Sequence, residues 1–369
     1  SGQSHEFMEE FDAIAREHGF GTFVAEIPPA HSTDGRARRQ VSGTLRDSLV
    51  MQALHSVHTD YVVCIDADTT TTLPLQVLVQ TMHAADLDVA SVRLTPANRD
   101  TFLSRLQAHE YRMSMRLRRI MPWMVSGGCH VLRTDVHREI MARHSLFFQG
   151  NDVELGLIAT ALRMKVGFIP FEVPTKVPAT LRPWLRQRKA WAGGEFRVMV
   201  VNLRLSIRHP WLSIYGGVVM FGLLPFRWYF VVHPTMALLA VLGVYMFVND
   251  LANWRHKDLA LVAYPFYSLA YSMVILPIGI YTYFKMSFTH HNFGIIRPFR
   301  PVHAGEVEPA LVGGLLRPGL LSPGLPGRPV SGRPVGVLIG SVGPAVPVGS
   351  AMLALGPGSP PRPELVGVG

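Results

Sequence analysis

The sequence predicts an α/β domain built on a mostly parallel sheet, followed by transmembrane helices and a disordered tail. Three observations support this fold class. Within residues 1–205, short apolar runs rich in β-branched residues alternate with helical patterns, an order typical of a parallel sheet covered by helices. Residues 206–290 are strongly apolar, and residues 291–369 form a linker and a tail rich in Gly and Pro.

The first region supplies the expected strands and helices in alternation. Residues 61–65 are a continuous apolar, β-rich run, which suits a strand buried on both faces. A helix is expected over 5–18, because apolar residues recur there at helical spacing before Gly19 and Gly21. The other expected elements are strands over 22–27 and 89–94 and helices over 44–56, 74–84 and 152–163.

The second region contains three stretches without charge, at 211–226, 228–248 and 259–284. The middle stretch has 21 residues, enough to cross the ~30 Å hydrocarbon layer as a helix. Whether the last stretch spans once or divides at Pro277 stays open. The alternative is a pair of core helices in a large soluble protein. We expect several membrane spans in contact with the lipid bilayer.

Charge is concentrated beside these apolar stretches. The formal net charge is +9, and between residues 181 and 210 seven basic residues oppose a single acid, Glu195. Basic residues directly before apolar spans follow the positive-inside rule, so we expect a multi-pass plasma-membrane protein whose first region is cytoplasmic. Nucleic acid is not an expected partner, because a binder of nucleic acid would place basic and exposed aromatic residues in a polar chain.

The tail over 301–369 has 15 Gly and 13 Pro and no Phe, Trp or Tyr. Such a composition buries too little apolar surface to offset the entropy of ordering the chain. The sequence therefore predicts disorder there.

Two carboxylates follow the predicted strand 61–65, at Asp66 and Asp68. Carboxylates at the end of a strand are suited to hold a hard divalent cation at the ligand-binding edge of an α/β sheet. A second pair, Asp86 and Asp88, precedes a strand and is interpreted as a solvated loop.

Three later segments also carry candidate chemistry. The glycines of Ser126-Gly127-Gly128-Cys129 allow a ligand close to the backbone, although a simple turn explains them equally well. Asp152 opens a predicted helix and is either an N-cap or a general base. Gln187, Arg188, Lys189 and Trp191 precede the apolar region, as membrane-interface anchors or as groups that stack on a sugar and bind phosphate.

In this order the four segments resemble the processive family 2 glycosyltransferases, which include hyaluronan, chitin and cellulose synthases. The hyaluronan synthase branch looks most similar, from LRQRKAW and from FYSLAYSMVILP ahead of HNFG. The resemblance covers about residues 20–300. It implies a GT-A-like, Rossmann-like catalytic domain that transfers a sugar from a UDP-sugar to a growing polysaccharide acceptor.

The resemblance also implies roles for these residues. Mg²⁺ or Mn²⁺ would bind Asp68 with help from Asp66, and Asp152 would be the base of an inverting transfer. Ser126, Gly127, Gly128, Cys129, Gln187 and Trp191 would contact the acceptor.

Two departures from the family pattern are visible. The Arg that precedes Trp in the family is Ala190 here, so Arg188 or Lys189 is expected to balance the charge of the diphosphate. The first strand of the nucleotide-binding half and the N-terminal membrane anchors are expected before Ser1. These departures keep two alternatives open, an impaired transferase-like scaffold for polysaccharide export and a non-processive enzyme that adds one sugar to a lipid.

Overall fold

The computed structural model describes residues 9, 13–14, 17, 20–24, 42–66, 68–146, 148–223, 229, 232–253, 255, 258–289, 335–340 and 351–355. Most of the helix expected over 5–18 lies outside these residues. The expected strand over 22–27 is described as β1, Phe20–Val24, and its last residues lie outside as well.

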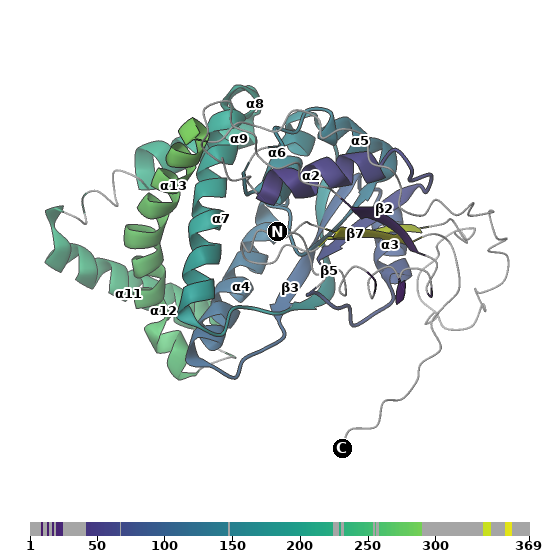
Figure 1. Ribbon diagram of the computed structural model, residues 1–369. Helices are drawn as coiled ribbons and strands as arrows, with labels where there is room; N and C mark the ends of the chain where they lie inside the picture. The colour runs from purple at the N-terminus through teal and green to yellow at the C-terminus, as the bar shows by residue number, and fades with distance from the viewer. Residues whose placement is uncertain are drawn as a thin grey trace, which may run out of the picture.

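The described strands form one mixed sheet in the order β1-β7-β6-β2-β4-β3-β5, seen at the right of Figure 1. Its strands are β1 (Phe20–Val24), β2 (Tyr61–Asp66), β3 (Val89–Pro96), β4 (Cys129–Arg133), β5 (Val166–Thr175), β6 (Val335–Gly340) and β7 (Ala351–Leu355). Only the β2–β6 and β3–β5 pairs are parallel, whereas β2–β4, β3–β4, β6–β7 and β1–β7 are antiparallel. The prediction of a mostly parallel sheet is therefore wrong.

The antiparallel course of β4 has a simple cause in the chain path. Helix α4 (Phe102–Ile120) follows β3, and the segment after it returns to the edge of the sheet at which β2 and β3 end. There the Asp66 amide donates to the Gly128 carbonyl oxygen over 2.9 Å. Since β4 starts at this edge, it must run against both of its neighbours. The alternation of strands and helices in the sequence does not indicate which edge of the sheet the chain reaches after α4, so it could not predict the direction of β4.

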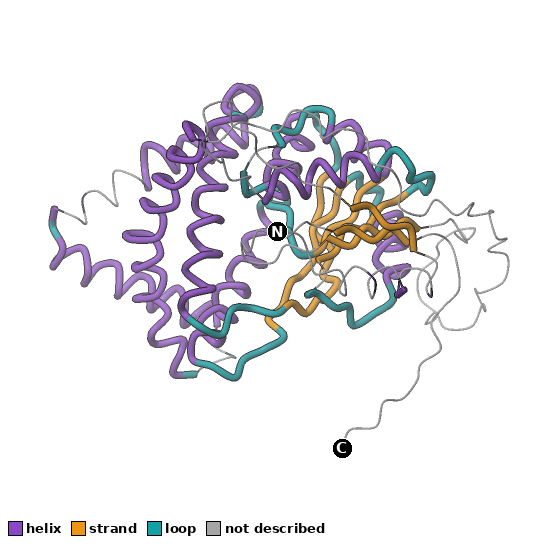
Figure 2. Tube along the Cα trace, in the orientation of Figure 1, coloured by secondary structure: helices purple, strands orange, loops and turns teal. Residues whose placement is uncertain are grey.

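Helices cover both faces of the sheet, as Figure 2 shows. On one face, α3 (Leu75–Ala84) and α4 pack on a core that includes Val63, Val92 and Val131. On the other face, α2 (Ser42–Ala53), α5 (Thr134–Met141) and α6 (Asn151–Ala161) pack on Val62, Cys64 and Leu132. The buried run predicted over 61–65 is confirmed, since all five of its residues are buried.

The tail differs from the prediction of disorder at two places. Residues 335–340 pair in parallel with β2, and residues 351–355 pair with β6 and β1. The sequence VGVLIG of β6 is apolar and favours strand formation. The edge of β2 offers backbone groups that need hydrogen-bond partners, so a short β-prone segment is held there despite the surrounding Gly and Pro.

The remaining helices form a bundle at the left of Figure 1. They are α7 (Leu181–Val201), α8 (Leu203–Arg208), α9 (Pro210–Gly217), π-helical η1 (Val218–Leu223), α11 (Pro234–Asn253), α12 (Leu259–Ala270), π-helical η2 (Tyr271–Ile275) and α13 (Leu276–Thr289). Helix α7 packs closely on α13, with no side chain between them at Gly193 and Gly279. A Cβ atom on Gly279 would lie 2.8 Å from the Gly193 amide nitrogen.

Within the described residues, one continuous helical run is long and apolar enough to cross a membrane. It is Leu259–Phe288, with 30 residues and 28% of its most apolar window buried. The run continues through Pro277, which lies in the first turn of α13 directly after the π-helical segment η2, so it does not divide there. Multiple spans are not confirmed, and parts of the stretches 211–226 and 228–248 lie outside the described residues.

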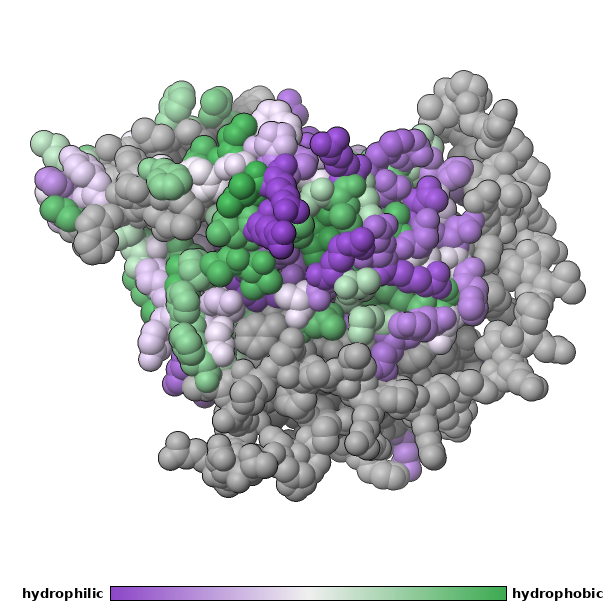
Figure 3. Space-filling model, turned by 90° about the horizontal axis from the view of Figure 1, so that it is seen from above, coloured by the Kyte–Doolittle hydropathy of each residue, from purple (hydrophilic) through white to green (hydrophobic). Residues whose placement is uncertain are grey.

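Large apolar side chains are exposed along this bundle, and Figure 3 shows apolar surface gathered toward the same end of the molecule. They include Trp211 at 73%, Phe221 at 86%, Met236 at 74% and Phe288 at 87% exposure. A patch of this kind on a folded domain marks a contact surface for lipid or for another protein.

The packing of α6 on the segment before β4 yields a stability prediction. A Cβ atom on Gly156 would lie 2.0 Å from the Trp123 carbonyl oxygen. Gly156→Ala should therefore lower the melting temperature by about 5 °C, because overpacking costs outweigh the ~1 kcal/mol gain in helix propensity. Gly216→Ala is the matched control, since nothing lies within 4 Å of its Cβ position. Equal melting temperatures for the two variants would contradict this packing.

Candidate active site

Asp66 lies at the end of β2 and is held by Arg46 from α2. The Arg46 Nη2 atom lies 3.0 Å from Asp66 Oδ1 and 3.4 Å from the Gly127 carbonyl oxygen. Burial raises the pKa of Asp66 to about 6, although Arg46 lowers it, and the charges of Asp68 and Asp152 raise it further. The acidic residues predicted from separate motifs therefore influence one another across one edge of the sheet.

Asp152 meets the glycine segment directly. A Cβ atom on Gly127 would lie 3.0 Å from Asp152 Oδ2, so the carboxylate lies against the Gly127 backbone. The N-cap of α6 is Gly150, which adopts a left-handed conformation with φ of 96° and makes no side-chain cap. Asp152 is therefore not the N-cap, and of the two sequence interpretations the capping role is excluded.

Asp68 is exposed in the turn that follows β2, where Thr69 Oγ1 donates to its Oδ1 over 3.2 Å. An exposed carboxylate beside the partly buried Asp66 is a suitable oxygen donor set for Mg²⁺ or Mn²⁺. Mg²⁺ in particular binds through one or two carboxylates together with substrate phosphates and water. The two residues thus supply oxygen ligands of the kind that the predicted metal prefers, although the described residues contain no group of three or more His, Cys, Asp or Glu side chains placed to hold a metal ion.

A buried ionic cluster fixes the start of α6. Arg197 from α7 lies 2.6 Å from Glu154 Oε2, and neither side chain is exposed. His144 lies 3.3 Å from the same oxygen, and Asn202 donates to Oε1 over 3.2 Å. Burial opposes ionisation of Glu154, yet these partners hold its pKa below the ordinary value. The cluster links the helix of Asp152 to the helix of Trp191.

Arg188 does not occupy the position predicted for it. Its side chain is buried, lies 2.7 Å from Glu110 Oε2 and donates to Gln107 Oε1 over 3.3 Å. The guanidinium that was expected to face a diphosphate is thus committed to α4. It also lies 4.3 Å from the centre of the Trp191 ring, whose residue is 37% exposed. One face of Trp191 is therefore supported by a cation.

The remaining predicted residues divide between the site and the core. Ser126 is fully buried and bonds Ser91 Oγ over 2.7 Å, and Cys129 is fully buried in β4. Both side chains are buried, Ser126 against Ser91 and Cys129 within the core of the sheet, so neither side chain is exposed to an acceptor. Lys189 is half-buried, and Gln187 Oε1 is buried without a hydrogen-bond partner within the described part of the chain.

Three charged residues near the candidate site were not predicted from the sequence: Arg46, Arg118 and Glu195. Burial lowers the pKa of Arg118, and the carboxylates of Asp152 and Glu195 counteract that effect. Glu195 lies four residues after Trp191, hence on the same face of α7. The four-residue spacing from Trp191 could therefore have identified Glu195 from the sequence. Arg46 gave no signal, because only the fold brings α2 to β2.

Asp47 lies beside the buried ionic cluster, with its Oδ2 atom 4.0 Å from His144 Nδ1, and predicts a pH effect on stability. Burial raises the pKa of Asp47 to about 6 from 3.8, against the effects of His144 and Arg46. The folded state therefore binds more protons between these values, and the contribution of Asp47 to the free energy of unfolding falls as pH rises. Asp47→Asn should gain on the order of 2 kcal/mol relative to wild type between pH 4 and 7, measured by unfolding at several pH values.

Asp135→Asn is the control for this measurement. Its carboxylate is exposed, and backbone and Arg133 hydrogen bonds hold its pKa below the ordinary value despite the opposing effect of burial. The contribution of Asp135 is present above its ordinary pKa of 3.8 and is lost only at lower pH, so the difference between Asp135→Asn and wild type should stay nearly constant between pH 4 and 7. A difference for Asp47→Asn that does not vary with pH would refute the buried cluster.

Two comparisons with individual proteins give partial similarity. An N-acetylglucosaminyltransferase of Bradyrhizobium diazoefficiens is 30% identical over 169 residues, which are 42% of this chain and 35% of that protein. The chain thus spans about a third of the length of this relative. A mannosyltransferase from Pyrobaculum calidifontis, solved with GDP-Man and Mn2+, aligns over 67% of each chain with a TM-score of 0.40 and 14% identity. A TM-score of 0.40 at 14% identity is too low to support a conclusion about the fold or function of this chain.

A family model gives the decisive comparison. The model described as glycosyl transferase family group 2 matches residues 61–284, well over half of the chain. The match begins at the first residue of β2 and includes Asp66, Asp68, Asp152 and Trp191. The mixed α/β sheet is the GT-A-like fold expected of such a domain. The chain therefore belongs to glycosyl transferase family group 2 and carries a glycosyltransferase domain of that family.

Proposed function

We propose that the protein is a membrane-bound, inverting glycosyltransferase that extends a polysaccharide with sugar from a UDP-sugar. The observation that carries the proposal is the contact of the Asp152 carboxylate with Gly127, next to Asp66 at the end of β2. This arrangement supports a base beside a nucleotide-binding edge. The exposed apolar bundle and the candidate span support membrane attachment.

In the proposed reaction, Asp152 accepts the proton of an acceptor hydroxyl. The hydroxyl oxygen attacks the anomeric carbon, and the bond from that carbon to the diphosphate oxygen breaks. Asp68 and Asp66 would hold Mg²⁺ or Mn²⁺, which supplies charge to stabilise the departing diphosphate. The Arg118 guanidinium interacts with the Asp152 carboxylate and places a positive charge near this base.

Trp191 is proposed to stack on the acceptor sugar. The Arg188 guanidinium occupies one side of its ring at 4.3 Å, while the residue stays 37% exposed. Gln187 Oε1, unpartnered within the described residues, is proposed to accept a hydrogen bond from an acceptor hydroxyl after a small rearrangement. Lys189 is proposed to contribute positive charge near the diphosphate, since Arg188 is committed to Glu110.

The base assignment predicts a separation of chemistry from binding. Asp152→Asn should reduce transfer of radiolabelled sugar in membranes by about 10²–10⁴-fold, because the amide cannot accept the proton. UDP binding, measured by calorimetry, should stay within a factor of about two, since it depends on other residues. The control Asp135→Asn removes a distant exposed carboxylate and should keep full activity. Unchanged turnover in Asp152→Asn would rule out this residue as the base.

The metal assignment predicts loss of cation-dependent UDP binding. Asp68→Asn should weaken UDP binding in the presence of Mn²⁺ by about tenfold or more, because the amide oxygen carries no charge. Asp86→Asn is a matched control from the other Asp-x-Asp pair, where the Asp86 side chain is 77% exposed and pairs with Lys165. If both variants bind UDP as wild type does, and if chelating Mn²⁺ changes nothing, the assignment fails.

A further inference from the structure

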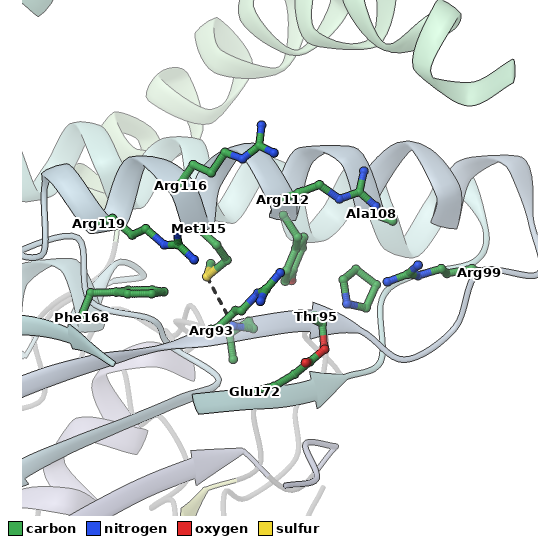
Figure 4. Close-up of a pocket in the computed structure, with 13 residues that line it drawn as sticks. Arg93, Thr95, Arg99, Ala108, Arg112, Met115, Arg116, Arg119, Phe168 and Glu172 are labelled. Atoms are coloured by element: carbon green, nitrogen blue, oxygen red, sulfur yellow. Dashed lines mark hydrogen bonds between the residues drawn. The ribbon is translucent and has the colours of Figure 1, made fainter. Parts of the chain in front are cut away.

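A polar cavity lies between α4 and the strands β3 and β5, and Asp152 is not among its lining residues. Its volume is about 360 Å³, and Figure 4 shows its lining residues. Five of them are arginines and one is an acid: Arg93, Arg99, Arg112, Arg116, Arg119 and Glu172. In Figure 4, Arg93, Arg99 and Arg119 extend into the space between α4 and β3.

One carboxylate, that of Glu172, accompanies five arginines in the lining of this cavity, so the lining carries an excess of positive charge. Among the described residues, Arg93, Arg99, Arg116 and Arg119 form no ion pair with an acid. Arg119 lies 5.8 Å from the centre of the Phe168 ring. Like charges gathered around one space repel each other, and an anion that enters removes this cost.

Arg112 is subject to this repulsion. Burial lowers its pKa, the charges of Arg99 and Arg116 lower it further, and the carboxylate of Asp258 opposes this effect. Its hydrogen bonds go to His109 Nδ1 at 3.0 Å and to Asn253 Oδ1 at 3.3 Å, neither of which is a carboxylate.

The cavity is separate from the candidate active site but shares a wall with it. Leu94 lines the cavity, and a Cβ atom on Gly128 would lie 3.4 Å from Leu94 Cδ1. Met115 closes the same wall, where the Leu94 amide donates to its sulfur over 3.3 Å. Neither the proposed transfer nor the proposed metal site uses any of the five arginines.

The cavity also lies beside the start of the candidate membrane span. His109 of α4 bonds Asp258, the N-cap of α12, over 2.7 Å, and Arg112 reaches the last residue of α11. Leu106 of α4 packs on Ala260 and Tyr264 of α12. The arginines therefore stand close to the end of an apolar helix, where the headgroups of a bilayer would lie.

We propose that this arginine cavity binds an anionic phosphate group. Guanidinium groups bind phosphate oxygens through paired, charge-assisted hydrogen bonds, and several of them converge here from a strand, a loop and a helix. The phosphate is carried either by an anionic lipid headgroup or by a soluble compound, and the two sources are distinguished by experiment.

The test uses the full chain in detergent micelles and measures binding by microscale thermophoresis. The probes are dioctanoyl phosphatidylglycerol, zwitterionic dioctanoyl phosphatidylcholine and inorganic phosphate. Arg99→Gln with Arg119→Gln removes two exposed arginines of the cavity. Arg143→Gln with Arg163→Gln removes the same charge from exposed positions outside it. Thermal unfolding without probe checks that both double variants fold.

Wild type and the Arg143/Arg163 variant should bind phosphatidylglycerol equally, and the Arg99/Arg119 variant at least about tenfold more weakly. Binding of phosphatidylglycerol but not inorganic phosphate supports the site with a lipid headgroup as its source. Comparable binding of inorganic phosphate supports the site with a soluble source. Equal binding by the two double variants, equal binding of phosphatidylcholine by wild type, or no binding of either anionic probe would overturn the proposal.

Discussion

The buried ion pair between Arg197 and Glu154 is the constraint on which the candidate site depends. Both side chains are fully removed from water, a state that is strongly unfavourable for either charge alone. Each therefore fixes the other, and with them the helices that they belong to. Asp152 stands two residues before Glu154, and Trp191 stands six before Arg197. The Arg197–Glu154 ion pair, which has no proposed role in the reaction, thus fixes the positions of the helices that carry Asp152 and Trp191.

The sequence was informative where chemistry follows local pattern. The strand that ends at Asp66 and the helix that begins near Asp152 were both predicted close to their observed bounds. Each of these depends on hydrophobic period or on turn residues within about a dozen positions. The family assignment followed from the same segments in their order along the chain.

What the sequence did not reveal depends on contacts between distant segments. Arg188 reads as a surface cation beside a membrane, yet its partner Glu110 lies on another helix. The sequence places Ser126 in a polar turn, yet its hydroxyl is buried and hydrogen-bonded to the hydroxyl of Ser91 in the sheet. The direction of β4 and the pairing of β6 with β2 likewise follow from where the chain returns to the sheet, which no local pattern records.

The contact between α7 and α13 has an evolutionary consequence. With only hydrogen atoms on Gly193 and Gly279, the two backbones meet without a buffer of adaptable side chains. Most packed interfaces absorb mutation by exchanging one rotamer or volume for another, whereas here even a methyl group would force the helices apart. Positions 193 and 279 should therefore vary far less among descendants of this gene than exposed positions of the same two helices, such as Val200 and Ile278.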